Sequence, residues 1–368
     1  MILIPRISIS ALRQRLWLVF FVALMGCAAT PAKGVPTEAE KAQASAEREA
    51  IVSAMNRELK RSLERLKFDD YEAPYFLSYQ LKDEETFSIA GKYGALTSQG
   101  NEHRRYVYVE ARVGSYEFDN LANIDTESYR FSDFRADRLA PIENDEQALR
   151  GTLWLLTDET YKKALSDYLT KRGGAVYSTP DKMSVPSFSR EEAVTYRGAV
   201  KPLQADKERF TALVREITAM MREADFLLDS QMEVSGRRIT RYLVNSEGSN
   251  IVDEQTIYSI HVQAQARAED GMLLENGRML YARDIDHLPD DENVRAATRE
   301  MLEELRALRD AEVINPYTGP AILDAEAAGV LFHEAVGHRL EGERQMDEQE
   351  GRTFKGRVGT RVIPSFLS

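Results

Sequence analysis

Two histidines lie five positions apart near the carboxyl end of this chain, in the run His333-Glu334-Ala335-Val336-Gly337-His338. Neutral imidazole is a good zinc ligand, and a carboxylate beside two imidazoles can act as a general base. On a regular α-helix, residues five apart are separated by roughly 140° around the axis, whereas residues four apart are separated by about 40°. The two histidines therefore cannot bind one ion from a straight helix. We expect a π-turn or kink near Gly337 that brings the imidazoles together.

The segment around this motif is predicted to form a buried helix. Asp324 suits the N-cap, Glu326 lies in the first turn, and the helix is expected to stop at Glu341-Gly342. The residues between are mostly apolar. An alternative interpretation makes the histidines hydrogen-bonded core residues and the glutamate a solvated carboxylate. A His-Glu pair on an otherwise apolar helix is hard to explain by packing, which favours the metal-site interpretation.

The first 27 residues are predicted to be a lipoprotein signal peptide. Three arginines precede an apolar run, residues 16–25, that is too short to span a bilayer. The run leads into Leu24-Met25-Gly26-Cys27, which has the form of a bacterial lipobox. Cys27 is the single cysteine of the chain and is expected to be acylated, with several acyl chains giving a stable anchor.

The expected location is the periplasmic side of the outer membrane. Ala28 follows the cysteine, in place of the aspartate that is associated with inner-membrane retention. The alternative is ordinary signal-peptide cleavage near Ala29, which would leave a soluble periplasmic protein.

A net charge of −12 without a basic stripe argues against a nucleic-acid partner, because a polyanion would be repelled.

The order of expected elements indicates an α+β fold with mixed or antiparallel sheets and packed helices, because helices and strands do not alternate strictly. After a short tether, the apolar periodicity predicts helices at residues 37–67, 146–171, 206–229 and 291–312. It predicts strands at residues 75–81, 86–92, 105–113, 231–234, 240–245, 251–254 and 258–266. We divide the chain into the signal peptide (1–27), tether and N-terminal helix (28–72), an N-terminal α/β region (73–205) and a central α+β region carrying the motif (206–368).

Residues 328–343 closely resemble the motif of the TldD/PmbA family of metallopeptidases, once labelled modulators of DNA gyrase. Residues 244–249 and 351–359 are also similar to stretches of that family. The resemblance implies that His333 and His338 bind Zn²⁺ and that Glu334 is the catalytic base on zinc-bound water. It also implies peptides or unfolded polypeptides as substrates, and a homodimer or a heterodimer with another family member.

The sequence departs from the family pattern in its third zinc ligand, which the family takes from a cysteine in a later C-terminal β domain. Cys27 is far upstream, so we expect a chain truncated relative to its family, in which that domain is absent. Glu341, Glu343 and His287 are candidate substitutes, because a catalytic zinc usually has three protein ligands. This chain alone is then expected to be a weak or inactive hydrolase with apolar surface exposed on the motif helix.

Two hypotheses follow. The first is a zinc metallopeptidase in which Glu334 acts as general base. The second is a catalytically incomplete, membrane-tethered binding subunit that partners a family member.

Overall fold

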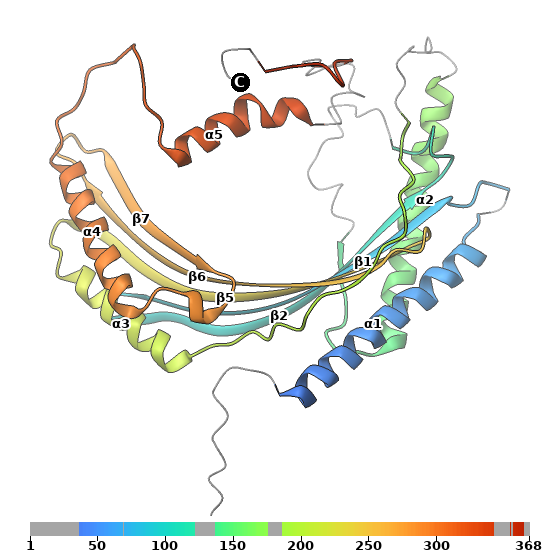
Figure 1. Ribbon diagram of the computed structural model, residues 1–368, viewed down its shortest axis with the longest axis horizontal. Coiled ribbons are helices and arrows are strands. Elements are labelled where there is room, and N and C mark those ends of the chain that lie inside the picture. The colour runs from blue at the N-terminus through green and yellow to red at the C-terminus, as the bar shows by residue number, and fades with distance from the viewer. Residues whose placement is uncertain are drawn as a thin grey trace, which may run out of the picture. The chain divides into compact units, whose positions relative to one another are not determined.

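The computed structural model describes residues 37–68, 70–121, 137–175, 186–341, 354 and 356–363, all within the compact unit Pro36–Ser368. These residues form a mixed α+β fold around one sheet, as expected. In the described part the sheet has seven strands in the order β3-β2-β1-β5-β6-β4, with β7 also paired to β6 (Figure 1). The pairs are antiparallel except β4 with β6. The strands are β1 (Phe76–Lys92), β2 (Ala95–Arg112), β3 (Asp137–Leu139), β4 (Thr195–Arg197), β5 (Leu227–Asn245), β6 (Asn250–Arg267) and β7 (Leu273–Ala282).

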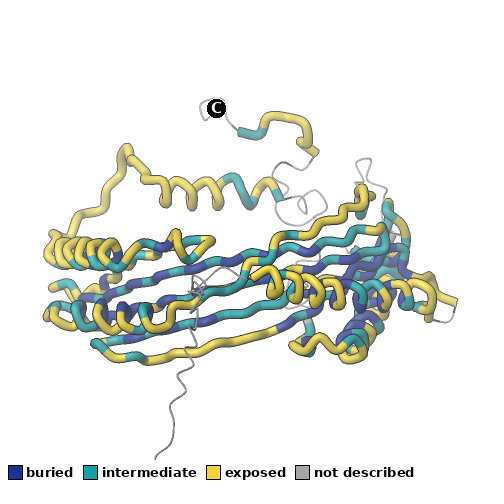
Figure 2. Tube along the Cα trace, turned by 60° about the horizontal axis from the view of Figure 1, so that its bottom comes forward, coloured by how far each residue is buried: buried dark blue, intermediate teal, exposed yellow. Residues whose placement is uncertain are grey.

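Four helices cover one face of this sheet, and alternate strand residues are buried beneath them (Figures 1 and 2). Beyond Phe76, which is buried against Phe188 at the start of the strand, the buried apolar residues of β1 all lie at odd positions and therefore on the same face: Leu77, Tyr79, Leu81, Phe87 and Ile89. The helices are α1 (Glu38–Arg65), α2 (Glu146–Ala175), α3 (Lys207–Arg222) and α4 (Asp291–Arg309). The opposite face presents mainly polar side chains.

The helix-covered face carries two hydrophobic clusters. The first joins α1 and α2 to one half of the sheet, and within it the Tyr79 hydroxyl is hydrogen-bonded to Ser62 and Thr157 at 2.9 Å each. The second joins α3 and α4 to the other half. Helix α1 starts with the expected capping box: Thr37 accepts from the N–H of Glu40, whose carboxylate accepts from the Thr37 N–H.

Charged residues separate the two clusters. Glu254 of β6 is buried and accepts hydrogen bonds from Arg48 of α1 and from the Thr240 hydroxyl of β5. Arg105 of β2 is also buried and donates to Asp83 of β1. Because each buried charge has an opposite partner, the long strands can pass from one cluster to the other without an uncompensated charge.

The pairs of short strands that periodicity predicts are in fact single long strands. Residues 75–81 and 86–92 both belong to β1, and the same holds for the two predicted pieces of β5 and of β6. The charged residues between the two predicted pieces of β1 are matched across the sheet, where Glu84 pairs with Arg237 and Glu85 with Arg238. Cross-strand charge pairing cannot be recognised before the strand order is known.

Some predicted ends of helices and strands were also wrong. Strand β7 was not predicted, and α3 ends at Arg222, where β5 soon begins, although a helix to residue 229 was expected. Helix α2 continues through Gly173-Gly174 to Ala175.

Strand β1, from the region 73–205, pairs directly with β5, from the region 206–368. None of the described helices is both long enough and apolar enough to cross a membrane.

Candidate metal centre

The motif helix α5 (Ala325–Ala335) begins where the sequence predicts. The Asp324 side chain accepts a hydrogen bond of 2.8 Å from the Ala327 N–H, as an N-cap residue should. The helix ends before the second histidine, and a 3₁₀ turn, η2 (Gly337–Leu340), follows it. The junction is Val336, whose φ of −123° and ψ of −49° leave the helical region. The expected irregularity is therefore confirmed as a kink.

Val336, and not Gly337, carries the unusual backbone angles. The φ angle of Gly337 is not positive, unlike that of Gly356 and Gly359. A Cβ added at Gly337 would meet its nearest atom, His333 Nδ1, at 3.8 Å, which is ordinary contact. The kink near Gly337 therefore depends neither on a backbone conformation particular to glycine nor on the lack of a side chain there.

The kink brings the two imidazoles face to edge. Their ring centroids lie 4.5 Å apart with the planes at 72°, and one ligand atom from each of His333, Glu334 and His338 lies within 4.8 Å of the others. Each Nε2 atom is 3.8 Å from an oxygen of the Glu334 carboxylate. Two imidazole nitrogens and a carboxylate oxygen this close form a donor set suited to zinc. In their identity and spacing, the residues fit the ion that the motif implies.

The three candidates for a third ligand have different positions. Glu341 Oε1 lies 2.7 Å from His338 Nδ1, on the opposite ring nitrogen from the one that faces Glu334. His287 is in the short 3₁₀ helix η1 (Ile285–His287), where it pairs with Asp284, and it is not part of the His-Glu-His group. Glu343 and Cys27 lie outside the described residues.

The contact between Glu341 and His338 is a feature that the sequence reasoning missed, because Glu341 was considered only as a metal ligand. The three-residue spacing between His338 and Glu341 could have indicated this contact. Residues three apart come into line on a 3₁₀ turn, which has three residues per turn. A glutamate three positions after a candidate ligand histidine is therefore placed to contact its ring.

The prediction of a buried motif helix is wrong for the described structure. No residue of α5 is buried, and Val330, Leu331 and Phe332 are 59%, 56% and 57% exposed. Apolar periodicity indicates that a helix has surface to bury, but it does not say which element covers that surface. The accompanying expectation of exposed apolar surface on this helix is confirmed, and the motif side chains are open to solvent.

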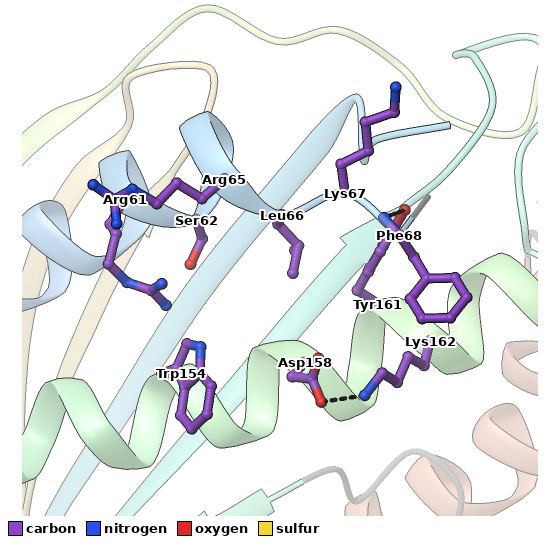
Figure 3. A pocket seen from close by; sticks show the side chains of 10 residues that line it. All are labelled: Arg61, Ser62, Arg65, Leu66, Lys67, Phe68, Trp154, Asp158, Tyr161 and Lys162. Atoms are coloured by element: carbon purple, nitrogen blue, oxygen red, sulfur yellow. Dashed lines mark hydrogen bonds and ion pairs between the residues drawn. The ribbon is translucent and has the colours of Figure 1, made fainter. Parts of the chain in front are cut away.

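Two of the cavities in the described part of the chain lie away from the motif. One, of about 170 Å³, lies between the end of α1 and the middle of α2, where Arg65, Leu66 and Trp154 line it (Figure 3). The other, of about 360 Å³, is lined by the start of α1 and by residues 197–200. Neither is lined by His333, Glu334 or His338, so the open surface of the kink is the candidate site for chemistry.

Solved structures share parts of this architecture at low similarity. A protein of Thermotoga maritima, described as a proposed modulator of DNA gyrase, is 10% identical with a TM-score of 0.41, and the match covers 72% of this chain and 49% of that one. A second protein so described, from Bacteroides thetaiotaomicron, is 12% identical with a TM-score of 0.48 over 81% of this chain and 58% of that one. TldE of Thermococcus kodakarensis is 16% identical with a TM-score of 0.36 over 69% and 47%.

This chain thus spans about half to three-fifths of the length of those proteins. The family comparison rests on sequence. Residues 200–309, from just before α3 to the end of α4, match the model of the PmbA/TldA metallopeptidase central domain. The HExxxH motif follows 24 positions after that match ends, counted from 309 to 333. Residues 200–309 thus form a central domain of the PmbA/TldA metallopeptidase type, and the HExxxH motif lies behind this domain in the chain.

Proposed function

We propose that this protein is a zinc metallopeptidase that hydrolyses peptides or unfolded polypeptides. The observation that carries the proposal is the position of Glu334 between the two histidines, with one carboxylate oxygen 3.8 Å from each Nε2. His333 and His338 would hold the ion through these nitrogens. A zinc ion supplies Lewis-acid activation of a water molecule and of the peptide carbonyl.

Glu334 would act as general base at this site. Its side chain is 64% exposed, so both oxygens are accessible to a water molecule and to a substrate. A carboxylate beside the attacking water can accept the proton that the water loses and then donate it to the leaving amine. One carboxylate that can reach both the attacking water and the leaving amine can therefore serve both proton transfers.

The open surface around the motif favours extended substrates. The side chains of His333 and His338 are 65% and 44% exposed, and Leu331 and Phe332 beside them offer apolar contact. A folded substrate would have to unfold locally to present a peptide bond to such a site, whereas an unfolded polypeptide presents one directly.

The test is turnover of an unfolded polypeptide, such as a fluorescently labelled, denatured casein, by the purified chain with added zinc. We expect Glu334→Gln to abolish turnover while zinc binding, measured by calorimetry, is retained. Glu326→Gln, which removes a carboxylate from the first turn of the same helix, should leave turnover unchanged. Turnover that survives Glu334→Gln would overturn the assignment of the base.

One observation favours a second candidate, a catalytically incomplete subunit that binds a family partner. In the described residues the group contains only two imidazoles and the glutamate assigned as base, and the apolar side chains of α5 are exposed. Such a surface is suited to contact with a homologous chain, as homodimer or heterodimer. Zinc binding without turnover, with turnover restored by a partner, would support this role over the first.

We also propose that the chain is held at the periplasmic side of the bacterial outer membrane by acylation of Cys27. The support is the lipobox form of residues 24–27 and the single cysteine of the chain at that position. Cys27→Ser should block processing or release the protein from the membrane fraction. Normal processing and unchanged fractionation of that variant would favour a soluble periplasmic protein.

A further inference from the structure

We infer that Glu341 is a positioning residue for the metal centre: its carboxylate holds the His338 ring so that Nε2 faces the ion. This inference rests on the proposed function, and it assigns Glu341 a role other than that of a third ligand. The observation is the 2.7 Å contact between His338 Nδ1 and Glu341 Oε1.

The chemistry of the two groups sets the direction of this hydrogen bond. An ionised carboxylate has no proton to donate, so Nδ1 must carry the hydrogen and donate it to Glu341. In a neutral imidazole the other nitrogen, Nε2, then has a free lone pair. That is the nitrogen 3.8 Å from Glu334, on the side where His333 also lies. The contact therefore selects the tautomer in which His338 can bind an ion.

The local backbone makes this contact possible. Because η2 has three residues per turn, Glu341, just beyond its end, returns to the side of the chain that carries His338. The Glu341 side chain is 41% exposed and the His338 side chain 44%. Burial does not hold either group, and the hydrogen bond to Glu341 limits rotation of the imidazole ring.

This geometry argues against Glu341 as a ligand. A carboxylate bound to Nδ1 lies beyond the ring from the ion that Nε2 faces, so it cannot reach that ion without first leaving the histidine. Carboxylate partners of this kind fix the orientation and raise the basicity of ligand histidines, and their loss commonly lowers metal affinity roughly 10- to 100-fold.

The first arm of the test is the tautomer of His338 in the metal-free, full-length protein. With only five histidines in the chain, ¹⁵N-histidine labelling gives an assignable spectrum. At about pH 8, where an unperturbed imidazole is neutral, we expect His338 to carry its proton on Nδ1. Glu341→Ala should allow the Nε2–H form, whereas Glu326→Ala should change nothing. An unchanged tautomer in Glu341→Ala would overturn the inference.

The second arm is metal binding. We expect Glu341→Ala to weaken zinc binding roughly 10- to 100-fold. Glu341→Gln should weaken it less, because the amide oxygen can still accept from Nδ1–H. Bound Co²⁺ should keep the absorption bands of the unaltered protein in both variants, since no ligand is lost. Altered bands would show that Glu341 is a ligand and overturn the inference.

The two arms separate this inference from the proposed function. Undiminished zinc binding by Glu341→Ala would remove the inference and leave the metal centre intact. Zinc binding that is absent from the unaltered protein, or that survives His333→Ala, would remove the proposed metal centre and the positioning role with it. Thermal unfolding of each variant provides the folding control.

Discussion

His333 and His338 face each other across a kink, with ring centroids 4.5 Å apart, although five positions separate them in the chain. A straight helix would place them roughly 140° apart around its axis. The φ angle of −123° at Val336 turns the chain off that axis before the second histidine. A five-residue spacing, which would separate two ligand histidines on a regular helix, therefore brings them together here. Their approach depends on the backbone angles of Val336.

Gly337 should tolerate alanine. Its φ is not positive, and a Cβ there would meet His333 Nδ1 at 3.8 Å and the Phe332 carbonyl oxygen at 3.9 Å. We expect zinc affinity of Gly337→Ala within about threefold of the unaltered protein, which corresponds to less than about 0.7 kcal/mol. Calorimetric titration measures this, with His338→Ala as the variant that should lose binding. A loss of more than about tenfold, or about 1.4 kcal/mol, would show that the glycine is required after all.

Glu254 should be important for stability because its side chain, only 2% exposed, pairs with Arg48 between the two hydrophobic clusters. Glu254→Gln leaves the arginine with an uncompensated buried charge, so we expect the free energy of unfolding to fall by about 3–5 kcal/mol. Glu49 pairs with Arg197 at the surface and is the matched control. Glu49→Gln should cost less than about 1 kcal/mol. Urea unfolding of both variants checks the difference, and equal losses would contradict it.

Gly236 should not tolerate alanine, because the rings of Phe87 and Tyr258 lie against it. A Cβ there would stand 2.9 Å from Tyr258 Cδ1 and would clash with Phe87. Both rings are buried, so we expect Gly236→Ala to lower the free energy of unfolding by about 1–3 kcal/mol. Gly100→Ala is the control on strand β2, where a Cβ meets nothing within 4 Å. Adding Phe87→Leu should recover part of the loss if the clash is its cause.

Asp229 should make stability depend on pH in the acid range. A hydrogen bond from Lys92, helped by the Tyr93 hydroxyl and the Ser230 N–H, holds the pKa of Asp229 below its ordinary value of 3.8. Because the folded-state pKa is the lower one, the stabilisation is complete above 3.8 and is lost as the pH falls through the folded-state value.

The corresponding variant is Asp229→Asn. It should unfold at lower urea concentration than the unaltered protein at neutral pH, and the difference should shrink as the pH falls below 3.8. Lys92→Met should show the same narrowing because it removes the main hydrogen-bond donor. A difference that stays constant across this range would exclude Asp229 as a source of the acid sensitivity.

Local chemistry made several features predictable from sequence. The capping box of Thr37 and Glu40 and the N-cap at Asp324 depend only on residues three apart, and both are present. The kink between His333 and His338 was expected from the angular period of a helix together with the premise that both imidazoles bind one ion. Identification of Glu334 between two histidines likewise needs only their adjacency in the chain.

Tertiary structure decided the rest, because those features depend on residues distant in sequence. The Lys82–Glu85 segment pairs with both β2 and β5, and arginines of β5 lie beside its two glutamates. Nothing in the periodicity of α5 could show that its apolar surface stays exposed, since burial depends on which element packs against it. Sequence determined which groups this protein has for chemistry, whereas tertiary structure determined which of them face one another, because side-chain contacts form in space and not along the chain.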